Sequence, residues 1–176
     1  MACSYNDVEQ AKSLLATGAV PTYFCLSIPV EQGYTDIVQL ILQDGRVDPT
    51  VTLGSDLEHI VTAAAHGYAD IVELLLDDTR VTARVLEHNT KFGLRGAILG
   101  SHLQVVELVV NKLKQLDLLE LYNEIGVACC SSGLEVINYL FEHYKSECIE
   151  NTDCLLRGAS ARKRPEVEQL IRLRCA

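Results

Sequence analysis

The chain has 176 residues, with 15 Lys or Arg against 24 Asp or Glu, so its formal net charge is −9. Apolar residues make up 48% and charged residues 22%, which excludes a wholly disordered chain, because disorder combines low hydrophobicity with high charge. The acidic balance argues against nucleic acid as a partner, since such binders need a basic face, and no apolar run approaches the roughly 20 residues that cross a membrane.

The N-terminus predicts a chain that is not secreted. Residues 1–9 contain neither the basic segment nor the apolar segment of a signal peptide. We therefore expect a cytoplasmic protein, with the nucleus as the alternative compartment. The seven cysteines are irregularly spaced and form no C-x-x-C, which predicts free and mostly buried thiols rather than disulfides. The Cys and His spacing also lacks a zinc pattern, so we expect no metal and no cofactor.

A segment of about ten residues recurs along the chain and predicts one helix in each copy. The copies are, in chain order, NDVEQAKSLL from Asn6, GYTDIVQLIL from Gly33, GYADIVELLL from Gly67, SHLQVVELVV from Ser101, SGLEVINYLF from Ser132 and RPEVEQLI from Arg164. An acidic or amide residue holds the same position in each: Glu9, Asp36, Asp70, Gln104, Glu135 and Glu166. The apolar residues that follow share one helical face, and a carboxylate in the first turn stabilises the unpaired N–H groups there.

A second marker keeps the same register and predicts another helix before each of the last five copies. It is a large apolar residue at Leu26, Ile60, Leu94, Ile125 and Leu156, followed three residues later by Pro29, Ala63, Ala97, Ala128 and Ala159. Gly33 and Gly67 fall between the two helices, where a tight connection favours positive φ. Because neither helix buries its apolar face alone, we expect an all-α fold, an α-solenoid of stacked antiparallel helix pairs.

This pattern resembles the ankyrin repeat, a unit of about 33 residues with a β-turn finger and two antiparallel helices. Residues 67–76 are similar to the family's G-H-x-E-V-V-x-L-L-L stretch. The resemblance covers nearly the whole chain as one domain with units at about 1–20, 21–54, 55–88, 89–119, 120–150 and 151–176, the first and last serving as caps. The family's T-P-L-H motif is absent from every unit, and two intervals shrink to 31 residues, so we expect shortened or degenerate fingers.

The resemblance implies a non-catalytic module that binds another protein on its concave face. The family's contact positions are the turn residue before the first helix of a unit and the two residues that end that helix. The partner-binding candidates at these positions are Tyr23, Glu31, Gln32, Leu57, His66, Lys91, Tyr122 and Arg162. Tyr23 and Tyr122 are the expected anchors, because aromatic residues with a polar tip dominate interfaces.

Other functions remain open at this stage. The chain has no G-x-S-x-G, H-E-x-x-H, P-loop or G-x-G-x-x-G motif, so we do not expect an enzyme. The alternatives are an inhibitor of an enzyme such as a kinase, an adaptor, and a structural or self-associating protein. We expect a monomer, whereas a structural or self-associating protein would form concentration-dependent oligomers.

Smaller features carry expectations of their own. Residues 157–176 hold six basic and two acidic side chains, a net +4 that predicts either a solvated polar cap or a docking patch for an acidic partner. We expect Asp44, Asp77 and Asp78 to point to solvent after their helices. Cys129 should be buried, with Cys130 partly exposed.

Overall fold

The structure is a computed structural model that describes residues 2–50, 59–81, 93–116 and 122–175. Over these ranges the protein is all-α and has no strand, which confirms the predicted fold class at that level. In chain order the elements are η1 (Ala2–Ser4), α1 (Val8–Ala16), α2 (Phe24–Gln32), α3 (Thr35–Asp44), α4 (His59–His66), α5 (Ala69–Asp77), a helical segment over 93–100, α7 (Leu103–Gln115), α8 (Tyr122–Ser131), α9 (Leu134–His143), α10 (Lys145–Glu150), α11 (Thr152–Ala161) and α12 (Pro165–Arg174). No helix within the described ranges has both the length and the apolar character that a membrane span requires.

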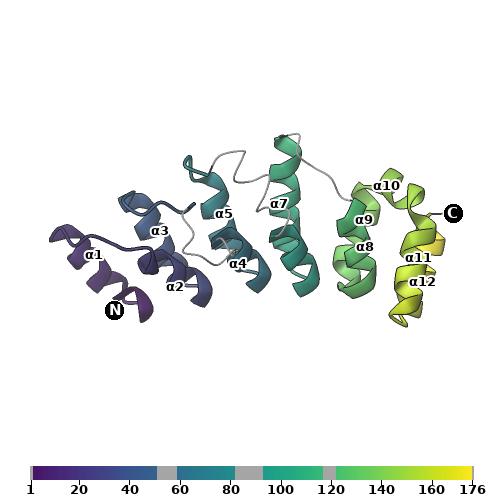
Figure 1. The fold of residues 1–176 in the computed structure, drawn as a ribbon, viewed down its shortest axis with the longest axis horizontal. Helices are drawn as coiled ribbons and strands as arrows, with labels where there is room; N and C mark the ends of the chain where they lie inside the picture. The colour runs from purple at the N-terminus through teal and green to yellow at the C-terminus, as the bar shows by residue number, and fades with distance from the viewer. Residues whose placement is uncertain (1, 51–58, 82–92, 117–121, 176) are drawn as a thin grey trace.

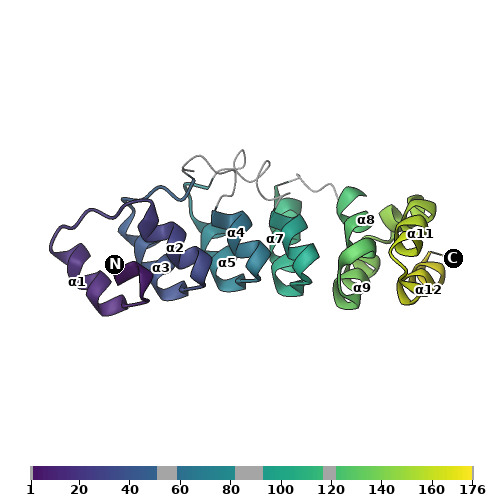
Figure 2. The ribbon, with the colours of Figure 1, turned by 60° about the horizontal axis from the view of Figure 1, so that its bottom comes forward.

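The helices follow one another along the long axis of the molecule, with the two termini at opposite ends (Figure 1). Within pairs, α2 contacts α3, α4 contacts α5, α8 contacts α9 and α11 contacts α12. Between pairs, α2 contacts α4 and α8 contacts α11, while α3, α5, α7 and α9 contact one another in succession. Turning the molecule shows the two rows, with α2, α4, α8 and α11 lying over α3, α5, α9 and α12 (Figure 2). This arrangement is compatible with a helical repeat.

The second helix of each pair begins where the repeated acidic residue predicts it. Asp36 lies in the first turn of α3 and Asp70 in the first turn of α5, and Glu135 and Glu166 hold the same place in α9 and α12. A carboxylate there interacts favourably with the free N–H groups of the helix start. The apolar residues behind each of them enter the core.

The large and small markers of the first helices are buried with one exception. Ile60 with Ala63, Leu94 with Ala97, and Ile125 with Ala128 are all at most 4% exposed. In α11 the fully buried leucine is Leu155, one residue before the predicted Leu156, which is only partly buried. Burial of a small residue at the same place in each helix lets the neighbouring helix approach closely.

Two glycines set the contact between neighbouring pairs. Gly33 and Gly67 have φ of 75° and 78°, which confirms the expected left-handed conformation. A Cβ atom on Gly33 would lie 2.9 Å from the ring of Tyr68, and one on Gly67 would lie 2.5 Å from the ring of His102. His102 also donates from Nε2 to the carbonyl of Ala65 at 3.1 Å. Each ring therefore covers the turn of the preceding pair, where only glycine leaves room.

The connection between α9 and α11 differs from the expected β-turn finger. It is the short helix α10, which contacts both of its neighbours. Tyr144 and Cys148 are buried there, at 8% and 0% exposed. Because these two apolar groups lie four residues apart, they share one face of a helical turn. The other expected fingers lie partly outside the described residues.

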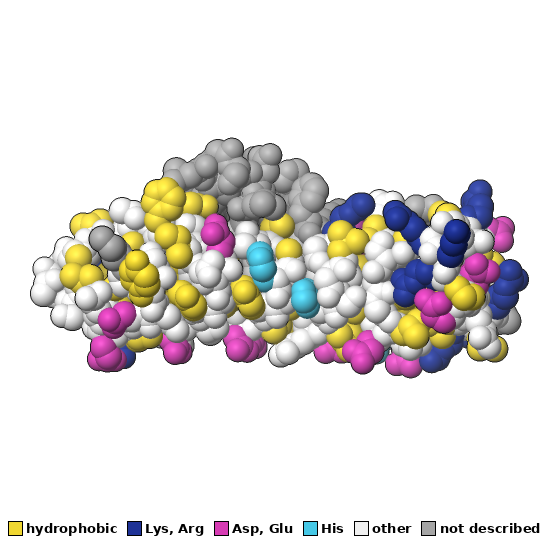
Figure 3. Space-filling view, turned by 90° about the horizontal axis from the view of Figure 1, so that it is seen from below, with side chains coloured by type: hydrophobic (Ala, Val, Ile, Leu, Met, Phe, Trp, Pro, Cys, Tyr) yellow, Lys and Arg dark blue, Asp and Glu magenta, His cyan; other side chains and the backbone are white. Residues whose placement is uncertain are grey.

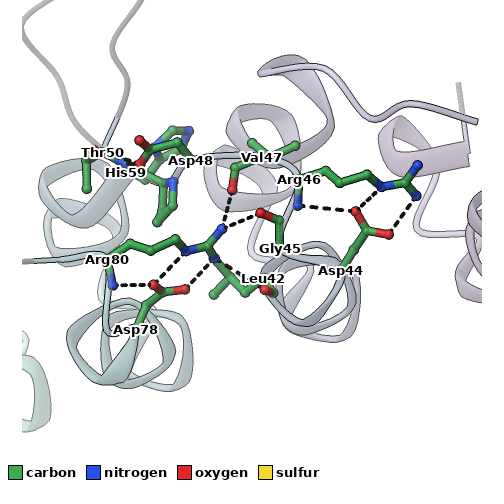
Figure 4. A network of polar contacts seen from close by, with 11 residues as sticks. Leu42, Asp44, Gly45, Arg46, Val47, Asp48, Thr50, His59, Asp78 and Arg80 are labelled. Atoms are coloured by element: carbon green, nitrogen blue, oxygen red, sulfur yellow. Dashed lines mark hydrogen bonds and ion pairs between the residues drawn. The ribbon is translucent and has the colours of Figure 1, made fainter.

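A repeated Asp-x-Arg sequence follows α3 and α5 (Figure 4). Asp44 accepts hydrogen bonds from the guanidinium of Arg46, and Asp78 from that of Arg80. The Asp44 and Asp78 side chains are only 14% and 10% exposed, so the expectation that they point to solvent is wrong. Each carboxylate is instead covered by the arginine two residues later. Asp77, the remaining member of that prediction, is exposed.

Arg80 also reaches the preceding helix pair. Its guanidinium donates to the carbonyls of Leu42 at 3.2 Å, Gly45 at 3.0 Å and Val47 at 2.7 Å. The C-terminal carbonyls of a helix lack partners within the helix, and a cation there also complements the helix dipole. Arg80 thus closes the end of α3 from the next repeat.

Candidate functional site

A groove lies between α2 and α4, in the row that the first helices form. It encloses about 380 Å³ and is lined by Tyr23, Ser27, Val30, Glu31, Gln32, His59, Thr62 and His66. Four of these residues were selected from the repeat register: Tyr23, Glu31, Gln32 and His66. The structure brings them together in one place.

The α2 side of the groove follows from helical spacing. Tyr23 immediately precedes α2, and Ser27 and Glu31 follow it at intervals of four residues, so all three share one face. Glu31 and Gln32 end the helix and are exposed, because Gly33 takes the left-handed conformation and turns the chain away. Burial, and secondarily the charge of Glu31, raises the pKa of the Tyr23 hydroxyl. The phenol therefore stays neutral at physiological pH.

The α4 side carries two histidines, and Nδ1 of each lies within hydrogen-bond distance of a backbone carbonyl. His59, Thr62 and His66 lie at i, i+3 and i+7 on one face of the helix. Nδ1 of His59 lies 3.0 Å from the Pro49 carbonyl, and Nδ1 of His66 lies 2.8 Å from the Thr62 carbonyl. Because a carbonyl oxygen only accepts, both Nδ1 atoms donate. In the neutral imidazole, each Nε2 is then a hydrogen-bond acceptor.

His59 is the unusual member of this pair. It is only 3% exposed, and its Nε2 has no hydrogen-bond partner among the described residues. Burial lowers its pKa, against smaller opposing effects of the Pro49 carbonyl and the Glu31 charge. The ring of Tyr23 lies against it, with 5.0 Å between ring centroids. The groove therefore contains a neutral, buried acceptor that is covered by an aromatic ring.

The charge of the groove is negative. Glu31 is an exposed carboxylate, and none of the described lining residues is Lys or Arg. Ser27 and Thr62 add hydroxyl groups, and Gln32 adds an amide. The arrangement combines hydrogen-bond acceptors, one carboxylate and one aromatic face, which suits binding of a donor-rich group.

The remaining predicted contact residues do not join this groove. Leu57 and Lys91 lie outside the described residues, and so does the side chain of Tyr122, whose backbone begins α8. Arg162 is exposed after the end of α11, at the C-terminal end of the molecule. Basic side chains gather over that end in the view from below (Figure 3).

Sequence reasoning missed His59, Thr62 and Ser27 as parts of the groove. His59 begins α4, and His66, the contact candidate at its end, is exposed. Steps of four and seven residues back from His66 would have reached Thr62 and His59 on the same helical face. The burial of His59 was not visible in this spacing, since it depends on the chain segment that contains Pro49.

None of the seven described cysteines forms a disulfide, as expected, but the expectation that they are mostly buried is wrong. Only Cys129 and Cys148 are buried, whereas Cys154 is exposed and the other four, Cys130 among them, are partly exposed. Within the ranges that the structure describes, no group of three or more His, Cys, Asp or Glu side chains is arranged to hold a metal ion.

Comparison of the chain with protein-family models, with curated proteins and with solved structures found no match. The assignment of a site therefore rests on the geometry of the groove and on the repeat register.

Proposed function

We propose that this protein is an ankyrin-like solenoid that binds another protein without catalysing a reaction, and that the groove between α2 and α4 is at the centre of its binding surface. One observation carries the proposal: four residues selected from the repeat register as contact positions line a single groove.

The rim of the groove supports a protein partner in particular. Phe24 is 59% exposed, and its ring meets that of Tyr23 edge to face with 5.8 Å between centroids. A pair of aromatic rings beside polar groups is the composition found at the centre of protein interfaces. Solenoids also build extended binding surfaces from equivalent positions of successive repeats.

The test is to replace Tyr23 with alanine and to measure capture of proteins from lysate of the source cells by mass spectrometry. Tyr5, which is 76% exposed in the segment before α1, provides the matched control. We expect Tyr23→Ala to lose a specific partner that both the wild type and Tyr5→Ala retain, with helicity unchanged by circular dichroism. Equal recovery by all three proteins would contradict the assignment of the groove.

A self-associating protein is the second candidate, because both ends of the molecule expose apolar side chains. Val20 is 76% exposed near the N-terminal end, and Leu173 is 71% exposed in the last helix. The terminal repeats of a solenoid usually present polar outer faces. Sedimentation at several concentrations decides between the candidates, since the partner-binding function predicts a monomer at each of them.

A further inference from the structure

We infer that the groove between α2 and α4 receives a basic side chain, arginine or lysine, from the partner protein. This inference rests on the proposed function and specifies the chemistry of its ligand. It is carried by the acceptors, the charge and the aromatic ring that the groove brings together.

The first argument is the unpaired acceptor. His59 is only 3% exposed as a residue, and its Nδ1 already donates to the Pro49 carbonyl. Nε2 therefore holds an unshared lone pair, and no described residue donates to it; the atom is itself buried, so a donor reaches it only if the side chains around it, such as Tyr23, move aside. The great majority of buried polar atoms in proteins have a hydrogen-bond partner. The unpaired Nε2 of His59 therefore points to a donor that a ligand supplies. His66 repeats the pattern at the exposed end of the groove, since its Nδ1 donates to the Thr62 carbonyl.

The second argument is the charge. Glu31 places a carboxylate at the rim, and the lining residues that the structure describes include no basic side chain to neutralise it. An anionic ligand would meet this carboxylate with no cation among the described lining residues to offset the repulsion. The net charge of the surrounding chain has the same negative sign as Glu31. The total charge is −9 and residues 157–176 carry +4, so residues 1–156 carry −13. A basic segment of a partner is therefore attracted to this part of the chain.

The third argument is the Tyr23 ring. It lies 5.0 Å from the ring of His59, centroid to centroid, and is partly exposed at the mouth of the groove. A cation above an aromatic face is attracted by the ring quadrupole, and a guanidinium also stacks on it. Arginine presents five N–H donors in one plane and lysine presents three, so either side chain can pair with several acceptors while contacting this ring.

The experiment selects binders from a library of random peptides displayed on phage, using the wild type and Tyr23→Ala as targets. We expect peptides that bind the wild type and not Tyr23→Ala to share one Arg or Lys position. Replacing that arginine with citrulline, its neutral isostere, should weaken binding about tenfold or more, because the citrulline lacks the charge and the cation–π contact.

Two variants of the protein test the carboxylate. Glu31→Gln should weaken binding of the arginine peptide by about two- to fivefold and leave binding of the citrulline peptide unchanged. Glu73→Gln, an exposed position in α5, is the matched control and should bind both peptides as the wild type does. In ¹H–¹³C spectra, the arginine peptide should shift the His59 ring signal saturably.

The outcomes separate the two proposals. Peptides that depend on Tyr23 but contain no shared basic residue would overturn this inference and leave the groove as a protein-binding surface. Peptides that bind Tyr23→Ala as well as the wild type would contradict the proposed function itself. If selection yields no peptide, acetyl-arginine amide and acetyl-citrulline amide are titrated directly, and absence of an arginine-specific shift at His59 overturns the inference.

Discussion

Arg46 and Arg80 occupy the same position in consecutive repeats, 34 residues apart, yet of the hydrogen bonds that the two side chains make with described residues, only those of Arg80 reach the preceding repeat. Both pair with the aspartate two residues earlier. Arg80 then donates to three carbonyls at the end of α3 and beyond it, whereas the side chain of Arg46 donates to Asp44. The same motif therefore acts locally in one repeat and between repeats in the next.

This difference predicts the effect of replacing each arginine with lysine. Arg80→Lys should lower the free energy of unfolding by about 1–3 kcal/mol, because one ammonium cannot replace a guanidinium that bonds to Asp78 and to three carbonyls, and the site is only 29% exposed. Arg46→Lys should leave the free energy of unfolding nearly unchanged. Urea unfolding followed by circular dichroism measures both. Equal losses in the two variants would show that the contacts with the preceding repeat contribute nothing.

The stability of the protein should fall on acidification because of His59. Burial lowers the pKa of this imidazole below its ordinary value of 6.5, so the unfolded chain binds a proton more readily than the folded one. The stability that His59 contributes is therefore complete above about pH 6.5 and is lost as the pH falls toward the folded pKa.

The measurement is the urea midpoint at pH 7.5 and at pH 5.5 for the wild type and for His59→Gln, which cannot titrate in this range. We expect a smaller fall in the variant than in the wild type. The groups that face His59, Tyr23 and Glu31, are unchanged in both proteins, so they cancel in the comparison. An equal decrease of the urea midpoint in both proteins would exclude His59 as the cause of the pH dependence.

Two glycines predict opposite effects of the same substitution. Gly67→Ala should destabilise the protein by about 1–3 kcal/mol, because alanine is strained at φ 78° and its Cβ would lie 2.5 Å from the His102 ring. Gly126, inside α8, has no atom within 4 Å of an added Cβ. Gly126→Ala should stabilise by about 0.5–1 kcal/mol, since alanine favours a helix. Thermal or urea unfolding checks both, and a stabilising Gly67→Ala would refute the packing of His102 on this turn.

The thiols should react in the order of their exposure. Burial, which is the largest effect, raises the pKa of Cys129 to about 12, so almost no thiolate is present there at pH 8. Cys154 is exposed. Iodoacetamide at pH 8 should therefore label Cys154 in the folded protein and Cys129 only after unfolding in urea, as read by mass spectrometry of peptides. Early labelling of Cys129 in the folded protein would contradict its burial.

The repeated residues were predicted well because the physics that selects them is local. A carboxylate such as Asp70 stabilises the first turn of its own helix. An apolar residue such as Ile71 lies on the apolar face of an amphipathic helix and is buried when that face packs on a neighbouring helix. The family's contact positions, carried onto this register, selected Tyr23 and His66, and both residues line the groove between α2 and α4. Contact positions at Leu57 and Lys91 lie outside the described residues and remain predictions.

The features that were missed depend on contacts between distant parts of the chain. Asp78 was expected in solvent because nothing near it in the sequence shows that Arg80 is held against the end of α3. His59 is buried beside Pro49, ten residues earlier, and a helical pattern does not reveal such a contact. The helix α10 was missed because its six residues are too few to establish a period.

The pairing of a glycine with a ring from the next repeat has a consequence for how the protein can gain repeat units. Gly33 lies under Tyr68 and Gly67 under His102, so a phenol and an imidazole fill the same place. Each junction is completed by residues 35 positions apart, one contributed by each of two consecutive units of 34 residues. Tandem duplication of one such unit would copy both its glycine, which receives a ring from the following unit, and its ring, which covers the glycine of the preceding unit. A new unit could therefore enter at this point of the chain with both of its junctions already formed.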